Sequence, residues 1–145
     1  MKFSKLSQLF LVSIIGLLVA AGLTACQLVS IDYVFVADSA GNSPGSAGQI
    51  ETYAVDAHSG ALRIVDPAVA SGGVKPVAMA VSGNYYHLYV ANAASKNVVH
   101  FTIADTGVLT KSDTITLPDT PVALAVSAAS NYLYVVYGTT SATLA

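Results

Sequence analysis

A repeat of 45 residues constrains the fold of this chain more than any other feature. The segment Pro76–Val90, PVAMAVSGNYYHLYV, returns without a gap as Pro121–Val135, PVALAVSAASNYLYV, and nine of the fifteen aligned residues are identical. A third, partial copy is indicated by FVAD at Phe35–Asp38, which matches YVAN at Tyr89–Asn92. Repeats of about 40–50 residues that contain several short strands are typical of β-propeller blades.

The start of each repeat has the pattern of an inner strand. Large apolar side chains alternate with alanine over Val77–Val81, and the second copy has the same alternation over Val122–Val126. Because neither face is polar, we expect this strand to be buried on both sides. A face of large residues opposite a face of alanines suits the narrow space near a propeller axis. We therefore expect Ala80 and Ala125 to be intolerant of larger side chains.

The remainder of the repeat predicts three more strands, at His87–Ala91, Asn97–Ile103 and Thr114–Leu117, with turn residues between them. Four antiparallel strands in about 45 residues make one blade. A β-sandwich also contains many short strands. An ungapped repeat of this length is not expected of a sandwich, so the pattern favours propeller blades.

The other two units are incomplete in the sequence. Strands are predicted at Ile31–Ala37, Gln49–Val55 and Leu62–Val65, with no clear inner strand before them, and the last unit supplies two strands up to about Tyr137. We therefore predict an all-β fold of antiparallel β-propeller blades, about two to two and a half, in an incomplete propeller that follows an N-terminal signal helix. The predicted blade units are 31–75, 76–120 and 121–145.

The N-terminus has the layout of a secretory signal. Lys2 and Lys5 precede the apolar stretch Leu9–Leu23, which ends in small residues. An uncleaved transmembrane helix is the alternative, because Leu6–Ala25 is nearly long enough to span a bilayer.

Cys26, the only cysteine of the chain, favours the signal interpretation. Leu23–Cys26, LTAC, resembles the bacterial lipobox, in which the cysteine is acylated and becomes the first mature residue. We therefore expect a lipoprotein signal peptide at 1–25, lipidation at Cys26, a short linker at 26–30 and a partial propeller at 31–145. The expected location is the bacterial cell envelope, on the periplasmic side or at the outer membrane. In lipoproteins that this motif resembles, a residue other than aspartate after the cysteine, here Gln27, indicates delivery to the outer membrane.

Charge and motifs argue against several functions. After position 25 the chain has four basic and eight acidic residues, without a basic stripe, which argues against nucleic-acid binding. We find no Gly-x-Ser-x-Gly elbow, phosphate loop or zinc motif, and we expect no metal and no cofactor.

The three histidines are the remaining candidates for chemistry. We expect His58 to be solvated in a turn, His87 to have a packing role, and His100 to point into a space between blades. They show no metal-ligand spacing with one another. Asp56 and Asp105 precede glycines in similar turns, and capping of those turns explains both.

The repeat resembles one family closely enough to be compared with it. PVALAVS, NYLYV and YVAN, with Asp105, Gly107 and Leu109 in the following turn, are similar to the lactonase-type seven-bladed β-propeller family. That family includes 6-phosphogluconolactonase-like enzymes and YVTN-repeat surface proteins. The resemblance covers nearly all of Asp32–Tyr137 and implies that full-length members are more than twice as long, so that this chain is similar to their N-terminal third.

Two functions follow from the resemblance. The first is a lipid-anchored extracytoplasmic propeller protein, truncated or non-catalytic, that serves as a binding or interaction segment. The second is a lactone hydrolase that is active only when the missing blades are supplied. The expected partners are the membrane, through the lipidated N-terminus, and further copies of the chain, through open blade edges. No catalytic residue is assigned and no small-molecule ligand is identified.

Overall fold

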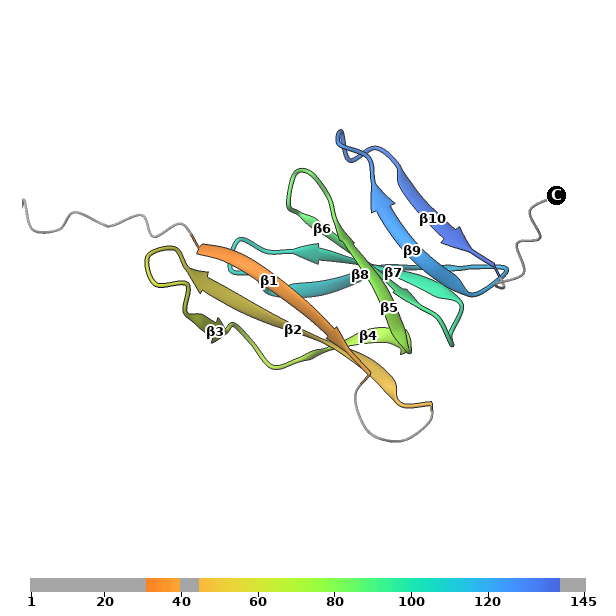
Figure 1. The fold of residues 1–145 in the computed structure, drawn as a ribbon, viewed down its shortest axis with the longest axis horizontal. Coiled ribbons are helices and arrows are strands. Elements are labelled where there is room, and N and C mark those ends of the chain that lie inside the picture. Colours follow the sequence, from red (N-terminus) through yellow and green to blue (C-terminus); the bar gives the residue numbers. More distant parts are fainter. Residues whose placement is uncertain (1–30, 40–44, 139–145) are drawn as a thin grey trace, which may run out of the picture. The chain divides into compact units, whose positions relative to one another are not determined.

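The computed structural model describes residues 31–39 and 45–138, and these form three antiparallel sheets (Figure 1). No helix of the described part is long and apolar enough to cross a membrane. The predicted signal peptide, Cys26 and the linker at 26–30 lie outside the described residues. The strands are β1 (Ile31–Asp38), β2 (Ala47–Asp56), β3 (Leu62–Ile64), β4 (Val69–Val74), β5 (Pro76–Val81), β6 (His87–Asn92), β7 (Asn97–Ile103), β8 (Leu109–Thr116), β9 (Pro121–Val126) and β10 (Leu133–Tyr137).

The second unit is a complete four-stranded blade. Strands β5, β6, β7 and β8 pair in chain order, each antiparallel to its neighbour, which confirms the predicted propeller-type sheet. The outer strand β8 begins at Leu109, earlier than the predicted start at Thr114, because the turn closes at Gly107 (φ +81°). Its residues from Thr110 onward are all exposed, so both of its faces meet solvent.

The turn that follows the inner strand is the same in two units. In each, a serine hydroxyl at the end of the strand accepts a backbone N–H from the residue five positions later, at 3.1 Å for both Ser82 and Ser127. Within each turn one residue adopts a left-handed backbone, Tyr85 with φ 64° and Ser130 with φ 58°. The 45-residue repeat therefore extends from sequence to backbone conformation.

The first unit contains a strand that the sequence analysis did not predict. Strand β4 pairs with the first half of β2, and β3 pairs with the second half. Together they form a split outer strand, and the gap between them contains Pro67, which has no N–H to donate to a sheet. Strand β4 thus occupies most of the stretch between β3 and the inner strand β5.

The hydrophobic core lies between the first and second units. Strand β2 contributes Ile50, and the complete blade contributes the large side chains on one of its faces. Three half-buried residues, Phe35, Val69 and Met79, pack against this cluster. The fully or nearly fully buried members are Ile50, Leu88, Val90, Val99, Phe101, Ile103 and Leu109.

The inner strands are less buried than predicted. Val77 and Val81 of β5 are exposed, and Val122 of β9 is 57% exposed. Ala125, predicted to lie in a tight space, is also exposed. Strand β9 lies along β5 and β6 (Figure 1), whereas no described residues cover the alanine face of β9. Burial on both sides is therefore wrong for both inner strands. Among the described strands, β5 has only partial cover from the first unit, and β9 has a neighbouring sheet on one side.

A buried polar cluster joins β4 to the complete blade. Asn92, fully buried, accepts a hydrogen bond from Ser71 Oγ at 2.9 Å, and its Nδ2 donates to the Ser71 carbonyl and to Asn97 Oδ1. Asn97 Nδ2 in turn donates to the Gly72 carbonyl. A Cβ on Gly73 would lie 2.7 Å from the Asn92 side chain, so the glycine permits this close approach. The asparagine of the YVAN motif therefore fastens one unit to the next.

Candidate functional site

Two histidines meet on the face of the complete blade that lies toward β9 and β10. His87 begins β6 and His100 lies in the middle of β7. Because Tyr89 pairs with His100, His87 is placed diagonally from His100 on the same face of the sheet. The two nitrogens His87 Nδ1 and His100 Nε2 are 2.9 Å apart, which is hydrogen-bond distance.

A row of side chains, one from each strand, supports this pair. Ala80, Tyr89, His100 and Asp113 are aligned across β5, β6, β7 and β8 by the strand register. The Tyr89 and His100 rings are stacked, with centroids 4.9 Å apart and planes inclined by 17°. Ala80, at the inner-strand end of this row, is half-buried.

Electrostatics favour the neutral form of His100. Burial lowers the pKa of His100 below its ordinary value, the neighbouring His87 lowers that pKa further, and Asp113 acts in the opposite direction. A neutral imidazole has one donor and one acceptor nitrogen, so the two rings can share one N–H···N hydrogen bond. Which ring donates depends on the tautomers.

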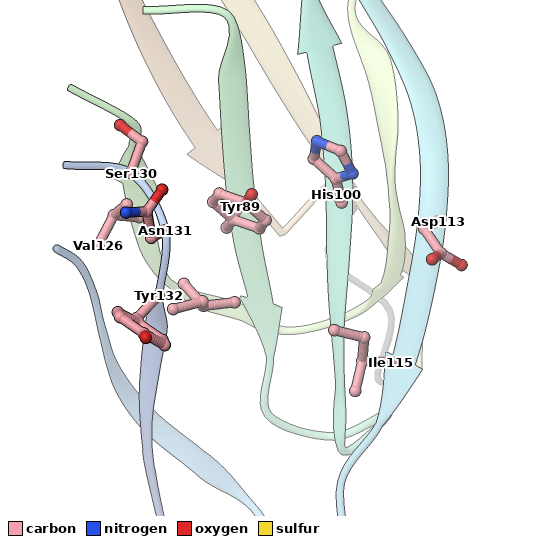
Figure 2. Close-up of a pocket in the computed structure, with 9 residues that line it drawn as sticks. Tyr89, His100, Asp113, Ile115, Val126, Ser130, Asn131 and Tyr132 are labelled. Carbon is pink, nitrogen blue, oxygen red and sulfur yellow. The ribbon is translucent and has the colours of Figure 1, made fainter. Parts of the chain in front are cut away.

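The row faces a hollow of about 290 Å³ (Figure 2). One wall is formed by Tyr89, His100 and Asp113, and the other by the β9–β10 turn with Tyr132, which is largely exposed. In Figure 2, Tyr132 and Asn131 stand across the hollow from the blade. The site can hold a small polar molecule and exchange a proton with it through an imidazole. In the described part of the chain no three His, Cys, Asp or Glu side chains gather as metal ligands.

The structure shows the surroundings of the histidines that were singled out in the sequence. His100 points toward the space beside the third unit, as expected. His58 is exposed in the β2–β3 turn, as expected, where its backbone N–H donates to Asp56 Oδ1 at 2.9 Å. The backbone N–H of Ser59 donates to the same oxygen at 2.8 Å, so this aspartate caps its turn. The bond from Ser59, and after it the bond from His58, lowers the pKa of Asp56.

Two interpretations were incomplete or wrong. Asp105 does not cap its turn, because among the described residues its carboxylate has no hydrogen bond, and its backbone carbonyl accepts one from Tyr33 instead. The His87–His100 contact was missed. It was available from the predicted strands, because a tight turn pairing Asn92 with Asn97 places these two histidines on one face. Cys26, the predicted lipidation site, lies outside the described residues.

One family model matches this chain, and several solved structures are similar to it. The family model described as Lactonase, 7-bladed beta-propeller, matches residues 28–143. No match was found among curated proteins.

The structural matches are partial. A chain of Kuenenia stuttgartiensis hydrazine synthase is similar with a TM-score of 0.48 and 26% identity, over 63% of this chain and 26% of that one. The Pseudomonas aeruginosa periplasmic gluconolactonase PpgL is similar with a TM-score of 0.47 and 21% identity, over 77% of this chain and 30% of that one. The chain thus spans less than a third of the length of either of these proteins.

Proposed function

Since the chain belongs to the lactonase, 7-bladed beta-propeller family, we propose that it supplies blades to a lactonase-type propeller at the bacterial cell envelope. In this role it is a binding or interaction segment, and strands from outside the described residues complete the propeller. The family membership agrees with the resemblance drawn from the repeat.

The open third unit is the observation that carries this proposal. Strand β10 pairs only with β9 among the described strands, so one edge keeps free backbone donors and acceptors. Val136 is 61% exposed, and Val122, Tyr134 and Tyr137 are also exposed. Exposed sheet edges and apolar patches of this kind favour association with further β-structure. The unit is thus suited to pairing with additional strands.

The open edge also supports self-association. No Lys or Arg follows Lys111 in the chain, so charge gives the third unit little protection against pairing with a second copy. Light scattering of residues 27–145 at tens of micromolar, a concentration at which exposed edges typically aggregate, should show species larger than a monomer. A monomer that stays stable at this concentration would contradict the open-edge interpretation.

Attachment to the envelope is proposed through a lipid on Cys26. The support is the LTAC motif, which places this single cysteine after an apolar signal-like stretch. Two or more acyl chains suffice for stable anchoring, because each buried methylene contributes about 0.8 kcal/mol. In cells fed a labelled fatty acid, the parent chain should carry label and Cys26→Ser should not. Equal labelling of the two would reject the anchor.

A lactone hydrolase is the second candidate, favoured by the His87–His100 pair beside the hollow. A neutral imidazole with a lowered pKa can accept a proton from water. The water oxygen would then bond to the lactone carbonyl carbon as the ring C–O bond breaks, and the proton would pass to the leaving alkoxide, giving a hydroxy acid.

One assay separates the two candidates. The full chain is mixed with a polypeptide that carries further lactonase-type blades, and hydrolysis of a sugar-acid lactone is followed by acid release. The binding role predicts no acceleration with or without the added blades. The hydrolase predicts acceleration in the mixture, and loss of that acceleration in His100→Thr.

A further inference from the structure

Two adjoining hollows lie where the first unit meets the turns of the second, apart from the histidine site. Their volumes are about 280 and 330 Å³, and both are lined by Tyr33, Tyr85 and Ile103. We call this region the tyrosine cradle and define it by Tyr33, Tyr85, Tyr86, Asp32 and Asp105. It contains three aromatic rings and two carboxylates contributed by two different units.

Tyr33 is a fixed wall of the cradle. Its hydroxyl donates to the Asp105 backbone carbonyl at 2.9 Å, which joins β1 to the β7–β8 turn. Its ring lies against Gly107, where any Cβ would collide with it. A ring fixed by this hydrogen bond and by its contact with Gly107 loses little conformational freedom when a ligand binds, which favours affinity.

Tyr85 has an unfavourable backbone conformation for a bulky residue in the turn it occupies. Its φ of 64° is left-handed, a conformation that glycine or asparagine adopts readily and a bulky side chain does not. The equivalent residue of the third unit, Ser130, has nearly the same φ, so the turn requires this backbone in both units. Packing does not account for the tyrosine, because its side chain is 76% exposed. Such strained positions cluster at ligand sites.

The two turns differ in the residues that reach the hollows. Tyr85 and Tyr86 occupy the positions of Ser130 and Asn131 in the third unit. Tyr86 is also exposed, at 55%. The second unit thus presents two solvent-facing rings at positions where an otherwise similar turn has small polar side chains.

The charge of the cradle is negative. Asp32 and Asp105 are exposed, and neither is in an ion pair with any described residue. No lysine or arginine lines either hollow. Tyrosine faces attract cations through the ring quadrupole, and ammonium groups are bound by clusters of aromatic rings in this way.

We propose that the tyrosine cradle binds a small organic cation of the ammonium class. The aromatic faces would contact its alkyl groups while the two carboxylates neutralise its charge at short range. This site is independent of the proposed propeller function and of the lipid anchor, since it is formed within the first two units.

The test is a calorimetric titration of the full chain in a polyoxyethylene detergent, which contains neither an ammonium group nor a sugar. The probes are choline and its uncharged carbon isostere, in which a tert-butyl group replaces trimethylammonium. Choline should bind saturably. The isostere has the same shape without the charge, so its affinity should be lower by about tenfold or more. Equal affinity for the two, stronger binding of glucose than of choline, or no saturation by choline in the millimolar range would overturn the proposal.

Variants locate the site. Tyr85→Ser should weaken choline binding roughly three- to tenfold, while its unfolding midpoint stays the same or rises, since serine occupies the same backbone conformation in the third unit. Tyr132→Ser, which removes an exposed tyrosine outside the cradle, is the matched control and should leave binding unchanged. Asp32→Asn retains the side-chain shape, and it should weaken choline binding without affecting the isostere. Unchanged choline binding in both Tyr85→Ser and Asp32→Asn would reject the site.

Discussion

The complete blade and the third unit have nearly the same sequence in their first two strands but very different surroundings. Leu88 and Val90 of β6 are fully buried, whereas their counterparts in β10, Leu133 and Val135, are only half-buried. The turns of the two units share a hydrogen bond to the serine hydroxyl and a left-handed backbone at the equivalent position. The repeat therefore determines local pairing, and the neighbouring sheets determine how much each residue contributes to stability.

The largest expected difference is between two leucines at equivalent positions. Leu88→Ala should lower the free energy of unfolding by about 2–5 kcal/mol, because it leaves a cavity in a closed core. Leu133→Ala should cost about 1 kcal/mol or less, because Leu133 already borders solvent and little apolar area is lost. Urea unfolding measures both, and equal losses would mean that the third unit is as well covered as the complete blade.

The next difference concerns the junction asparagine. Asn92→Ala should cost about 1–3 kcal/mol, because the Ser71 carbonyl and Asn97 Oδ1 lose the hydrogen bonds that Asn92 Nδ2 donates inside this cluster. The third unit has Tyr137 at the equivalent position, where it is exposed and meets no such cluster among the described residues. Tyr137→Ala is therefore the control, with an expected change within about 0.5 kcal/mol. A comparable loss in the two variants would contradict the assignment of Asn92 as the fastening residue.

Inner-strand alanines offer a sharper test of the same contrast. Ala80→Leu should cost about 1–3 kcal/mol, because Ala80 lies beside Tyr89 on the face covered by β9. Ala125→Leu should be nearly neutral, because the corresponding face of β9 is exposed. If Ala125→Leu is the more destabilising of the two, then something outside the described strands covers the third unit.

The smallest expected effect is a pH dependence of stability that arises from His100 in the complete blade. The pKa of His100 lies below the ordinary 6.5, so the unfolded chain binds this proton more readily than the folded chain. The stability that neutral His100 contributes is present above pH 6.5, and it is lost as the pH falls through the lowered pKa. Urea midpoints between pH 8 and pH 5 should therefore decrease more steeply in the parent than in His100→Thr. Parallel pH profiles would exclude a role for this residue.

Strand positions could be predicted from the sequence where the repeat was intact. The alternation from Val77 to Val81 and the Ser-Gly-Asn turn located β5 and β6 closely. Strand β4 could not be predicted in this way. Its residues, VASGGV, include two glycines that weaken strand propensity, and it exists because the ten-residue β2 offers a partner beyond the end of β3.

Contacts between side chains were harder to predict than strand positions. The His87–His100 contact depends on strand register, which a turn of one residue more or less would have reversed. The left-handed backbone of Tyr85 could not be predicted from the sequence, because two tyrosines before a strand are consistent with ordinary β-propensity. The burial of inner strands was overestimated, because alternation shows which faces are apolar and not whether a neighbour covers them.

The meander of the complete blade also bears on how the chain acquires its structure. Every strand from β5 to β8 pairs only with its neighbour in the sequence, so the sheet has low contact order and no long loop must close before it forms. Polypeptides emerge from the ribosome at roughly 5–20 residues per second, which is slow compared with hairpin formation in microseconds. The blade can therefore assemble one hairpin at a time during synthesis, and the first unit then has a finished surface on which to pack.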